Sequence, residues 1–498
     1  MKDGFTLIEI LAIIILLSVL ALVTYPIING VINDSRKDLY DKQIDELERH
    51  TRTWISENVE SLELVDGYSR NVTFEELKNS GYIQESSVIN PKTNEPLSGC
   101  MTINYSDEIT GFNVYYNEKC SEIAKGYADN SGANRPELFE NMVPIKYENN
   151  KWIVADTSQK WYDYNNKEWA NAVVLNKGVT KNIGNEITEE EISLWYVWLP
   201  RYKYTIFNGN KGNVSEQLIN ITFENGVDKT GTLRCNDNAD GSETCTDNTY
   251  GSIVNGKSTY THPAFKFGNT NLTGFWVGKF EVSGSTSTIT VKPNVTSLRN
   301  QTVSSFFTAI QNVKTTYGIN NADSHMMKNM EWGAVAYLKQ SKYGLGTTDI
   351  AVNDNASYYT GGGTSDAYKT NVAQSTTGNI YGVYDMSGGA WEYVMGNYND
   401  TISSSGFSSM PDKKYYNKYT SSTGKMGDAT METLKTSGTY GGGDGWYSDF
   451  TKFPPTNGQW FYRSGGNSDA KYAGVFYFYS SGGQSIKTIS SRAVLSAQ

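Results

Sequence analysis

Hydrophobic positions are distributed very unevenly along this chain. Residues 5–23 form an almost unbroken apolar run in which Glu9 is the one charged side chain. About 20 apolar residues, each rising about 1.5 Å, are enough to cross a bilayer. Residues 5–27 are therefore predicted to form a transmembrane helix, and Lys2 favours an inside N-terminus. An unpaired carboxylate in such a span is costly, which makes Glu9 a functional candidate.

Beyond Pro26 the apolar positions recur at the three- and four-residue spacing of an amphipathic helix. They are Ile44, Leu47, Trp54, Ile55, Val59 and Leu62. A helix continuous from Phe5 to about Asn58 would be ~80 Å long. The outer half of its apolar stripe needs to be covered by a small globular head.

Residues 28–122 are predicted to contain the rest of this helix and its head. Thr73 and Glu76 form a capping-box pattern at the start of a short helix. Residues 100–105 and 112–116 have the composition of two strands that pair as a hairpin.

The remainder of the chain reads as short strands and polar loops. A polar connector and an aromatic, strand-rich module are predicted at residues 123–190, followed by a large mixed α/β domain at residues 191–498. The aromatic side chains of the module are either a sugar-stacking face or simply core. The predicted fold class is therefore α+β, with a long N-terminal transmembrane and amphipathic helix.

The amino-acid composition excludes some classes of protein. The 35 Tyr and 11 Trp among 498 residues are too many for a disordered chain. The formal net charge of −10 provides no basic surface for nucleic acid, so no nucleic-acid partner is expected. The four cysteines form two local pairs without metal-binding spacing, and in an oxidising compartment we expect disulfides Cys100–Cys120 and Cys235–Cys245.

The segment Gly4-Phe5-Thr6-Leu7-Ile8-Glu9 resembles the cleavage and methylation motif of type IV prepilins. The resemblance implies that a prepilin peptidase cuts the Gly4–Phe5 bond, that Phe5 becomes the N-methylated first residue, and that residues 1–4 are the leader. It also implies that Glu9 pairs with the Phe5 ammonium of a neighbouring subunit during assembly. Two charges that are costly when buried singly then fix the register of the helices.

Several short sequence segments from residue 191 onward resemble those of the formylglycine-generating enzyme (sulfatase-modifying factor) family. The fold of that family is a variant of the C-type lectin fold. The segments occupy residues 195–200, 275–282, 330–336, 378–393, 462–466, 474–476 and 491–494. Gly389 stands where that family usually has Asn. Those enzymes use cysteine thiols near the C-terminal end, and this chain has no cysteine after Cys245. We therefore expect no catalytic residue in this domain.

The same domain contains two weaker candidates for binding. The run from Phe476 through Tyr477 and Phe478 to Tyr479 either faces a ligand or is a strand with one ring on each side. Members of the family hold calcium near the dipeptide that corresponds to Trp391-Glu392 here. The resemblance therefore suggests Asn379 and Glu392 as calcium ligands. Glu392 is equally interpretable as a buried hydrogen-bonding residue.

These observations favour a type IV pilus subunit, in a minor or tip position, that displays a non-catalytic recognition or adhesion domain. The alternatives are a pseudopilin of a secretion or DNA-uptake apparatus, and an exported enzyme on a pilin anchor. The expected partners are other pilin subunits, the prepilin peptidase, the membrane before assembly, and an unidentified surface ligand. The expected location is the cytoplasmic membrane as a single-pass prepilin, then the cell-surface pilus of a Gram-positive bacterium.

Overall fold

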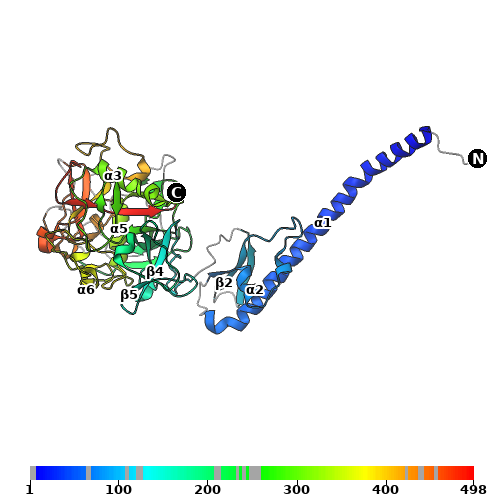
Figure 1. Ribbon diagram of the computed structural model, residues 1–498, viewed down its shortest axis with the longest axis horizontal. Coiled ribbons are helices and arrows are strands. Elements are labelled where there is room, and N and C mark those ends of the chain that lie inside the picture. The colour runs from blue at the N-terminus through cyan, green and yellow to red at the C-terminus, as the bar shows by residue number, and fades with distance from the viewer. Residues whose placement is uncertain are drawn as a thin grey trace, which may run out of the picture. The chain divides into compact units, whose positions relative to one another are not determined.

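The computed structural model describes residues 7–62, 69–106, 111–118, 127–206, 215–231, 235–237, 243–245, 259–420, 424–435, 442–453 and 458–498. Its chain divides into two compact units, Met1–Gly126 (unit 1) and Tyr127–Gln498 (unit 2). Figure 1 shows α1 and the first strands in blue, and the later elements of unit 2 in green to red.

Unit 1 is built on one long helix. It contains α1 (Leu7–Leu62), β1 (Ser69–Val72), α2 (Phe74–Asn79), β2 (Cys100–Ser106) and β3 (Gly111–Asn117). The strands form an antiparallel sheet in the order β1-β2-β3, which confirms the predicted hairpin. The Thr73 side chain accepts a hydrogen bond from Glu76 N at 3.0 Å, as the capping pattern predicted.

The core of unit 1 lies between the second half of α1 and this sheet. Leu47, Trp54 and Ile55 on α1 are buried against side chains of the sheet and α2, which are Val72, Leu77, Met101, Ile103 and Val114. The polar and apolar positions of α1 beyond Pro26 thus separate onto two sides, because one side is covered and the other meets water.

The predicted transmembrane helix is wrong. Among the described residues, no helix is both long enough and apolar enough to cross a membrane. The apolar run of α1 is interrupted by Glu9, Ser18 and Thr24, and it passes without a break into a strongly charged stretch.

Unit 2 is mostly β-structure. Its first strands are β4 (Met142–Glu148), β5 (Lys151–Val154), β6 (Asn171–Leu175), β7 (Glu186–Ile187), β8 (Ile192–Pro200), β9 (Tyr202–Thr205), β10 (Asn220–Phe223), β11 (Cys235–Asp237), β12 (Glu243–Cys245) and β13 (Tyr260–Thr261). They are followed by β14 (Lys266–Phe267), β15 (Thr270–Asn271), β16 (Gly274–Gly278), β17 (Ser283–Ser285), β18 (Thr288–Thr290) and β19 (Asp323–Met326). The last strands are β20 (Trp391–Tyr398), β21 (Asn417–Tyr419), β22 (Trp460–Ser464), β23 (Gly474–Ser481), β24 (Ile489–Ser491) and β25 (Ala493–Ser496).

The α-helices described in unit 2 are short. They are α3 (Val303–Gln311), α4 (Val313–Tyr317), α5 (Asn329–Lys339) and α6 (Ala367–Thr370). Every residue of α5 is buried, so this helix lies inside the unit rather than on its surface. The predicted α+β class is therefore wrong, because strands and irregular segments make up most of unit 2.

The aromatic stretch predicted as a separate module is part of the main sheet. This antiparallel sheet has the order β19-β25-β16-β8-β6-β4-β5-β7, so β4 to β7 continue directly from the later strands. All nine residues of β8 are buried, since neighbouring strands and packed layers cover it on every side. Its aromatic side chains are core, and Trp195 and Trp198 are fully buried.

A second sheet of unit 2 has the order β21-β20-β22-β23, with β24 parallel to one end of β20. β20 and β23 both pair with β22 in antiparallel fashion. The two sheets and α5 share one continuous hydrophobic core.

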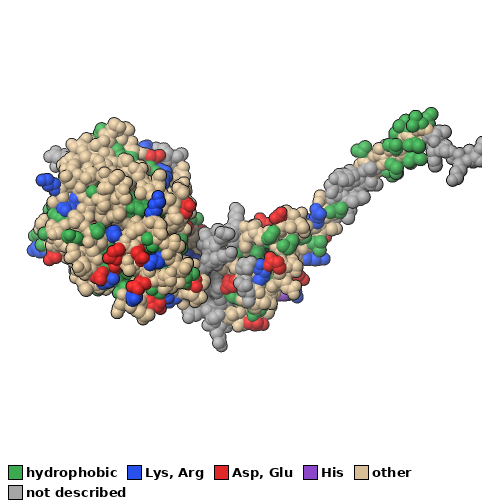
Figure 2. Space-filling view, in the orientation of Figure 1, with side chains coloured by type: hydrophobic (Ala, Val, Ile, Leu, Met, Phe, Trp, Pro, Cys, Tyr) green, Lys and Arg blue, Asp and Glu red, His purple; other side chains and the backbone are tan. Residues whose placement is uncertain are grey.

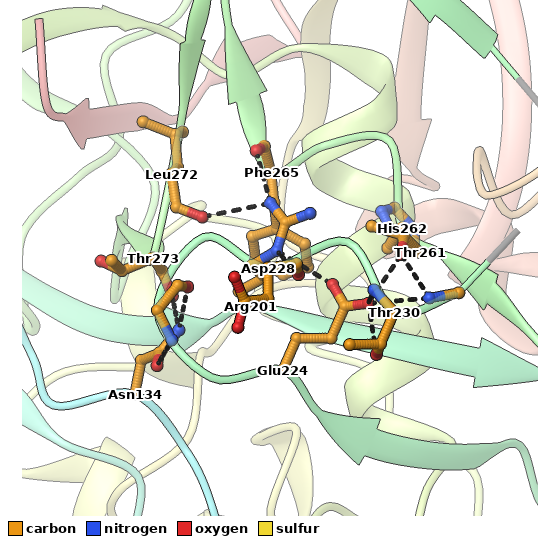
Figure 3. A network of polar contacts seen from close by, with 12 residues as sticks. Asn134, Arg201, Glu224, Asp228, Thr230, Thr261, His262, Phe265, Leu272 and Thr273 are labelled. Atoms are coloured by element: carbon orange, nitrogen blue, oxygen red, sulfur yellow. Dashed lines mark hydrogen bonds and ion pairs between the residues drawn. The ribbon is translucent and has the colours of Figure 1, made fainter. Parts of the chain in front are cut away.

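A buried ion pair fixes the segment after β10. Arg201 Nε lies 2.9 Å from Glu224 Oε2, and both side chains are almost fully excluded from solvent. Glu224 Oε1 accepts hydrogen bonds from Thr230 N at 2.8 Å and from Thr261 Oγ1 at 2.6 Å (Figure 3). One carboxylate therefore ties the segment after β10 to β13, which lies far beyond it in the sequence.

A second buried charged group links β19 to α5. His325 is fully buried, with Nδ1 3.0 Å from Asp323 Oδ1 and Nε2 3.0 Å from Glu331 Oε1. Its ring stacks on Phe267, with the centroids 4.6 Å apart. Burial alone lowers the pKa of His325, but Glu331 and Asp323 outweigh it and the net pKa is raised.

We predict that His325→Gln lowers the free energy of unfolding by about 3 kcal/mol at pH 5.5, because the buried carboxylates of Asp323 and Glu331 lose the imidazolium between them and keep only the more distant Lys414 and Lys328. A histidine whose pKa is raised on folding stabilises the fold at pH values below its unfolded-state pKa of about 6.5. This contribution is lost as the pH rises through the pKa of the folded state. The loss should therefore be smaller at pH 9.

Urea unfolding followed by tryptophan fluorescence measures both values, with His50→Gln on α1 as the control. An equal loss at the two pH values would show that the histidine is not charged in the folded protein.

Candidate functional site

The second sheet of unit 2 uses its two sides differently. Side chains alternate along a strand, so every second residue of β20, β22 and β23 lies on the same side. In the observed register Tyr393 is opposite Tyr462, and Tyr462 is opposite Tyr479. Trp391 and Tyr477 lie two residues from Tyr393 and Tyr479 along their strands and complete the same side.

We call these five residues, Trp391, Tyr393, Tyr462, Tyr477 and Tyr479, the aromatic face. Tyr462 is its central ring. The Tyr462 centroid lies 6.2 Å from those of Trp391 and Tyr393, 6.3 Å from that of Tyr477 and 5.5 Å from that of Tyr479. Trp391, Tyr462 and Tyr479 are half-buried, whereas Tyr393 and Tyr477 are buried.

Most of these rings meet Tyr462 at steep angles. The ring planes of Trp391, Tyr393 and Tyr479 make angles of 63°, 88° and 81° with it, and only Tyr477 is close to parallel. Side chains on a sheet stand roughly perpendicular to it. The aromatic face therefore offers ring edges and hydroxyl tips rather than one flat platform.

The hydroxyl groups of the aromatic face differ in their partners. Tyr393 OH donates to Gln484 O at 2.8 Å and lies 2.7 Å from Ser481 Oγ. Burial raises the pKa of Tyr393 to about 12. Among the described residues, neither the Tyr462 nor the Tyr479 hydroxyl has a hydrogen-bond partner, and both side chains are half-buried.

Two segments border the aromatic face. Residues 449–452 run beside β23, where Phe450 contacts Tyr477 and Tyr479 at 5.7 and 5.6 Å between centroids. Lys452 Nζ lies 5.6 Å from the centre of the Tyr479 ring, within the range of a cation–π contact. The other border is the loop from β22 to β23, which carries the exposed Tyr472.

Positive backbone φ angles occur in these borders and next to them. Ser464, Ala470, Tyr447 and Ser448 all have positive φ, at 78°, 46°, 59° and 72°. Non-glycine residues rarely adopt such angles, and strained positions tend to gather at functional sites. Positive φ also occurs at many non-glycine residues away from this face, so these angles alone do not single it out.

The opposite side of the same strands is core. Phe461, Phe476 and Phe478 are fully buried there, together with Arg463. Of the four residues predicted from sequence to bind a ligand, Phe476 and Phe478 therefore point into the core and Tyr477 is 5% exposed. Tyr479 is the most accessible of the four.

Sequence reasoning missed Trp391 and Tyr462 as members of this site. The signal was present as aromatic residues two apart, at Trp391 and Tyr393 and at Tyr477 and Tyr479. What was lacking was the pairing of the strands, since β20 and β22 are separated by some 60 residues of chain.

The two residues predicted as calcium ligands are engaged within the protein. Glu392 is fully buried, and its carboxylate accepts hydrogen bonds from Arg492 Nε at 2.9 Å and from Arg492 Nη2. Burial raises the pKa of Glu392 to about 7, against the opposing effect of Arg492. Asn379 Oδ1 accepts from Thr377 Oγ1 at 2.7 Å and Tyr381 N at 2.9 Å.

Within the described ranges, no group of three or more His, Cys, Asp or Glu side chains is arranged to hold a metal ion. His262 is also engaged, because its Nε2 donates to Gly427 O at 2.9 Å and its Nδ1 accepts from Ala264 N. Burial lowers the pKa of His262 to about 3, so the ring is neutral.

The other predicted site residues are only partly placed. Gly4 and Phe5 lie outside the described residues, and Glu9 is in α1. Cys100 takes part in a disulfide, whereas Cys120 lies outside the described residues. Cys235 and Cys245 are opposite each other in the register of β11 and β12. Both disulfide pairings and the processing site stay predictions.

No family model and no curated protein matches this chain. One solved structure, a "Major Tropism Determinant I1 Variant", aligns with 81% of this chain and 82% of its own length. The identity is 13% and the TM-score is 0.27, a likeness too weak to support a conclusion about fold or function.

We predict that Tyr479→Phe leaves stability within about 0.5 kcal/mol of wild type, because its hydroxyl has no partner to lose. The matched change Tyr393→Phe should cost about 1–2 kcal/mol, since it removes a buried donor that leaves Gln484 O unsatisfied. Urea denaturation midpoints of the two variants, compared with wild type, measure these losses of stability. Equal losses would show that the Tyr479 hydroxyl is bound within the protein.

Proposed function

We propose that this chain is a type IV pilus subunit, in a minor or tip position, that displays a non-catalytic recognition domain. In this proposal the first half of α1 packs against other subunits in the filament. The aromatic face of unit 2 binds the surface ligand. The observation that carries the assembly part is the exposed apolar surface at the start of α1.

Large hydrophobic side chains are exposed along the first four turns of this helix and beyond. Leu7 is 84% exposed, Ile8 78%, Leu16 63% and Leu22 75%. Figure 2 shows the hydrophobic side chains along this end of α1. Contiguous apolar surface of this extent marks an interaction site, because each Å² left in water costs roughly 25 cal/mol.

Further copies of the same helix are the occupants that fit this surface. Apolar side chains project from all sides of the helix, as in helices that lie in the centre of a bundle. The charged second half of α1 is covered on one side by the sheet of unit 1 and is not available in this way. The prepilin-like segment from Gly4 to Glu9 supports the same assignment, with Glu9 paired to the Phe5 ammonium of a neighbouring copy.

The aromatic face supports the recognition part. Tyrosine and tryptophan on rigid strands offer a large contact area with little loss of side-chain entropy on binding. Their neighbours in the bordering loops are Gly, Ser, Asn and Asp, residues that provide adaptable hydrogen bonds. A rigid sheet with variable loops at its edge is a common arrangement for binding.

Assembly is tested with full-length protein expressed in cells that carry a pilus apparatus. Sheared filaments should contain wild-type chains that begin at Phe5, as measured by intact mass, and should lack the Glu9→Gln variant. The control is Glu46→Gln, an exposed glutamate farther along α1, which should enter filaments normally. Filaments that contain Glu9→Gln chains at the wild-type level would contradict the proposed pairing.

Recognition is tested by applying full-length protein to arrays of host glycans and purified surface proteins. A ligand bound by wild type should bind at least about thirtyfold more weakly to Tyr462→Ser, because a central aromatic anchor contributes about 2 kcal/mol or more. The control Tyr115→Ser changes an exposed tyrosine of unit 1 and should bind normally. A ligand bound equally by all three proteins would place the binding site elsewhere.

A further inference from the structure

The loop between β22 and β23 lies across one end of the aromatic face. A Cβ added to Gly465 would lie 3.0 Å from Tyr477 Cδ2, and one added to Gly466 would lie 3.1 Å from Trp391 Cε2. Both glycines therefore place the loop backbone directly on the rings. We call residues 466–472 of this loop the strap.

One side chain fastens the strap to the aromatic face. Asp469 Oδ2 accepts hydrogen bonds from Trp391 Nε1 at 2.8 Å and from Gly466 N at 2.9 Å. In the part of the chain that the structure describes, no other side-chain hydrogen bond joins the strap to the aromatic face. Asp469 is thus the latch.

The two ends of the strap are fixed by the backbone. Asn467 N donates to Gly389 O at 2.8 Å, and Tyr472 O accepts from Phe450 N at 3.0 Å. Between these ends, Ser468, Ala470 and Lys471 are exposed. Backbone hydrogen bonds of the strap, from Asp469 N to Gly466 O and from Ala473 N to Ala470 O, shape its middle, and the latch joins that middle to Trp391. The two fixed ends are the points about which the middle can move.

The closed strap is held in a strained conformation. Ala470 has φ 46° and ψ −122°, values typical of the first central position of a type II′ turn, which is normally glycine. The Cβ of alanine is crowded by its own backbone there. Opening releases this strain, so the closed and open forms differ less in free energy than the contacts alone would suggest.

We propose that the middle of the strap opens to free the indole edge of Trp391 for a ligand, with Asp469 as the latch and Ala470 as the strained position that opening relaxes. This inference rests on the proposed recognition function, whose site it regulates. In the closed form Trp391 is half-buried, and its indole N–H is taken up by Asp469. A ligand that uses the whole aromatic face therefore requires the open form.

Hydroxyl-radical footprinting of the full-length protein, read by mass spectrometry at Trp391, measures this opening without any ligand. In Asp469→Ala the open population should rise about tenfold, because two hydrogen bonds to a carboxylate are lost, and labelling of Trp391 should increase. In Ala470→Gly labelling should fall, because glycine removes the strain of the closed form.

Ser468→Ala is the matched control, since this exposed strap residue makes no contact with the aromatic face. Tyr479 gives an internal reference outside the strap, and fully buried Trp195 must stay unlabelled in every variant that is folded. If Asp469→Ala does not fold, the direction of the change in Ala470→Gly decides the question.

Unchanged labelling in Asp469→Ala, or increased labelling in Ala470→Gly, would overturn the strap proposal. Neither result depends on a ligand, so the recognition function could still hold and would be judged separately by the array experiment. Conversely, if the labelling changes as expected but the arrays yield no ligand, the strap proposal stands and the proposed recognition function is contradicted.

Discussion

The alternation of side chains along β20, β22 and β23 is the constraint on which the candidate site depends. Phe461, Phe476 and Phe478 fill the core because their neighbours Tyr462, Tyr477 and Tyr479 cannot share that side of the sheet. A shift of one residue in the pairing would exchange the two sets. The register that packs the core is therefore also the one that builds the aromatic face.

Buried ion pairs also constrain the packing of unit 2. Arg492 with Glu392 joins segments 100 residues apart, Arg201 with Glu224 joins the end of β8 to the segment after β10, and His325 with Glu331 joins β19 to α5. Each pair is satisfied in one arrangement of the strands, and any other arrangement leaves a charge buried without a partner. In a unit with short strands and many loops, such pairs select one packing among several that bury similar apolar area.

The two proposed tasks, assembly and recognition, belong to different units of the chain. The proposed assembly surface is a single helix whose apolar side chains are useful only when covered by other copies. The proposed binding surface is a sheet whose aromatic side chains are already held in place by the fold, with the strap as the one movable cover. Because different units carry these surfaces, a change in the loops of unit 2 need not disturb the helix.

The sequence by itself determined the local elements. Periodicity located the buried positions of α1 at Leu47, Trp54 and Ile55, and composition located the hairpin of β2 and β3, because these patterns depend on neighbours close in the chain. The class of the fold, the membrane span and the separate aromatic module were mispredicted. Only the tertiary structure decided that β4 to β7 extend the main sheet, and that Trp391 and Tyr462 lie beside Tyr477. These features depend on the pairing of strands distant in sequence, and no local pattern specifies which strands meet.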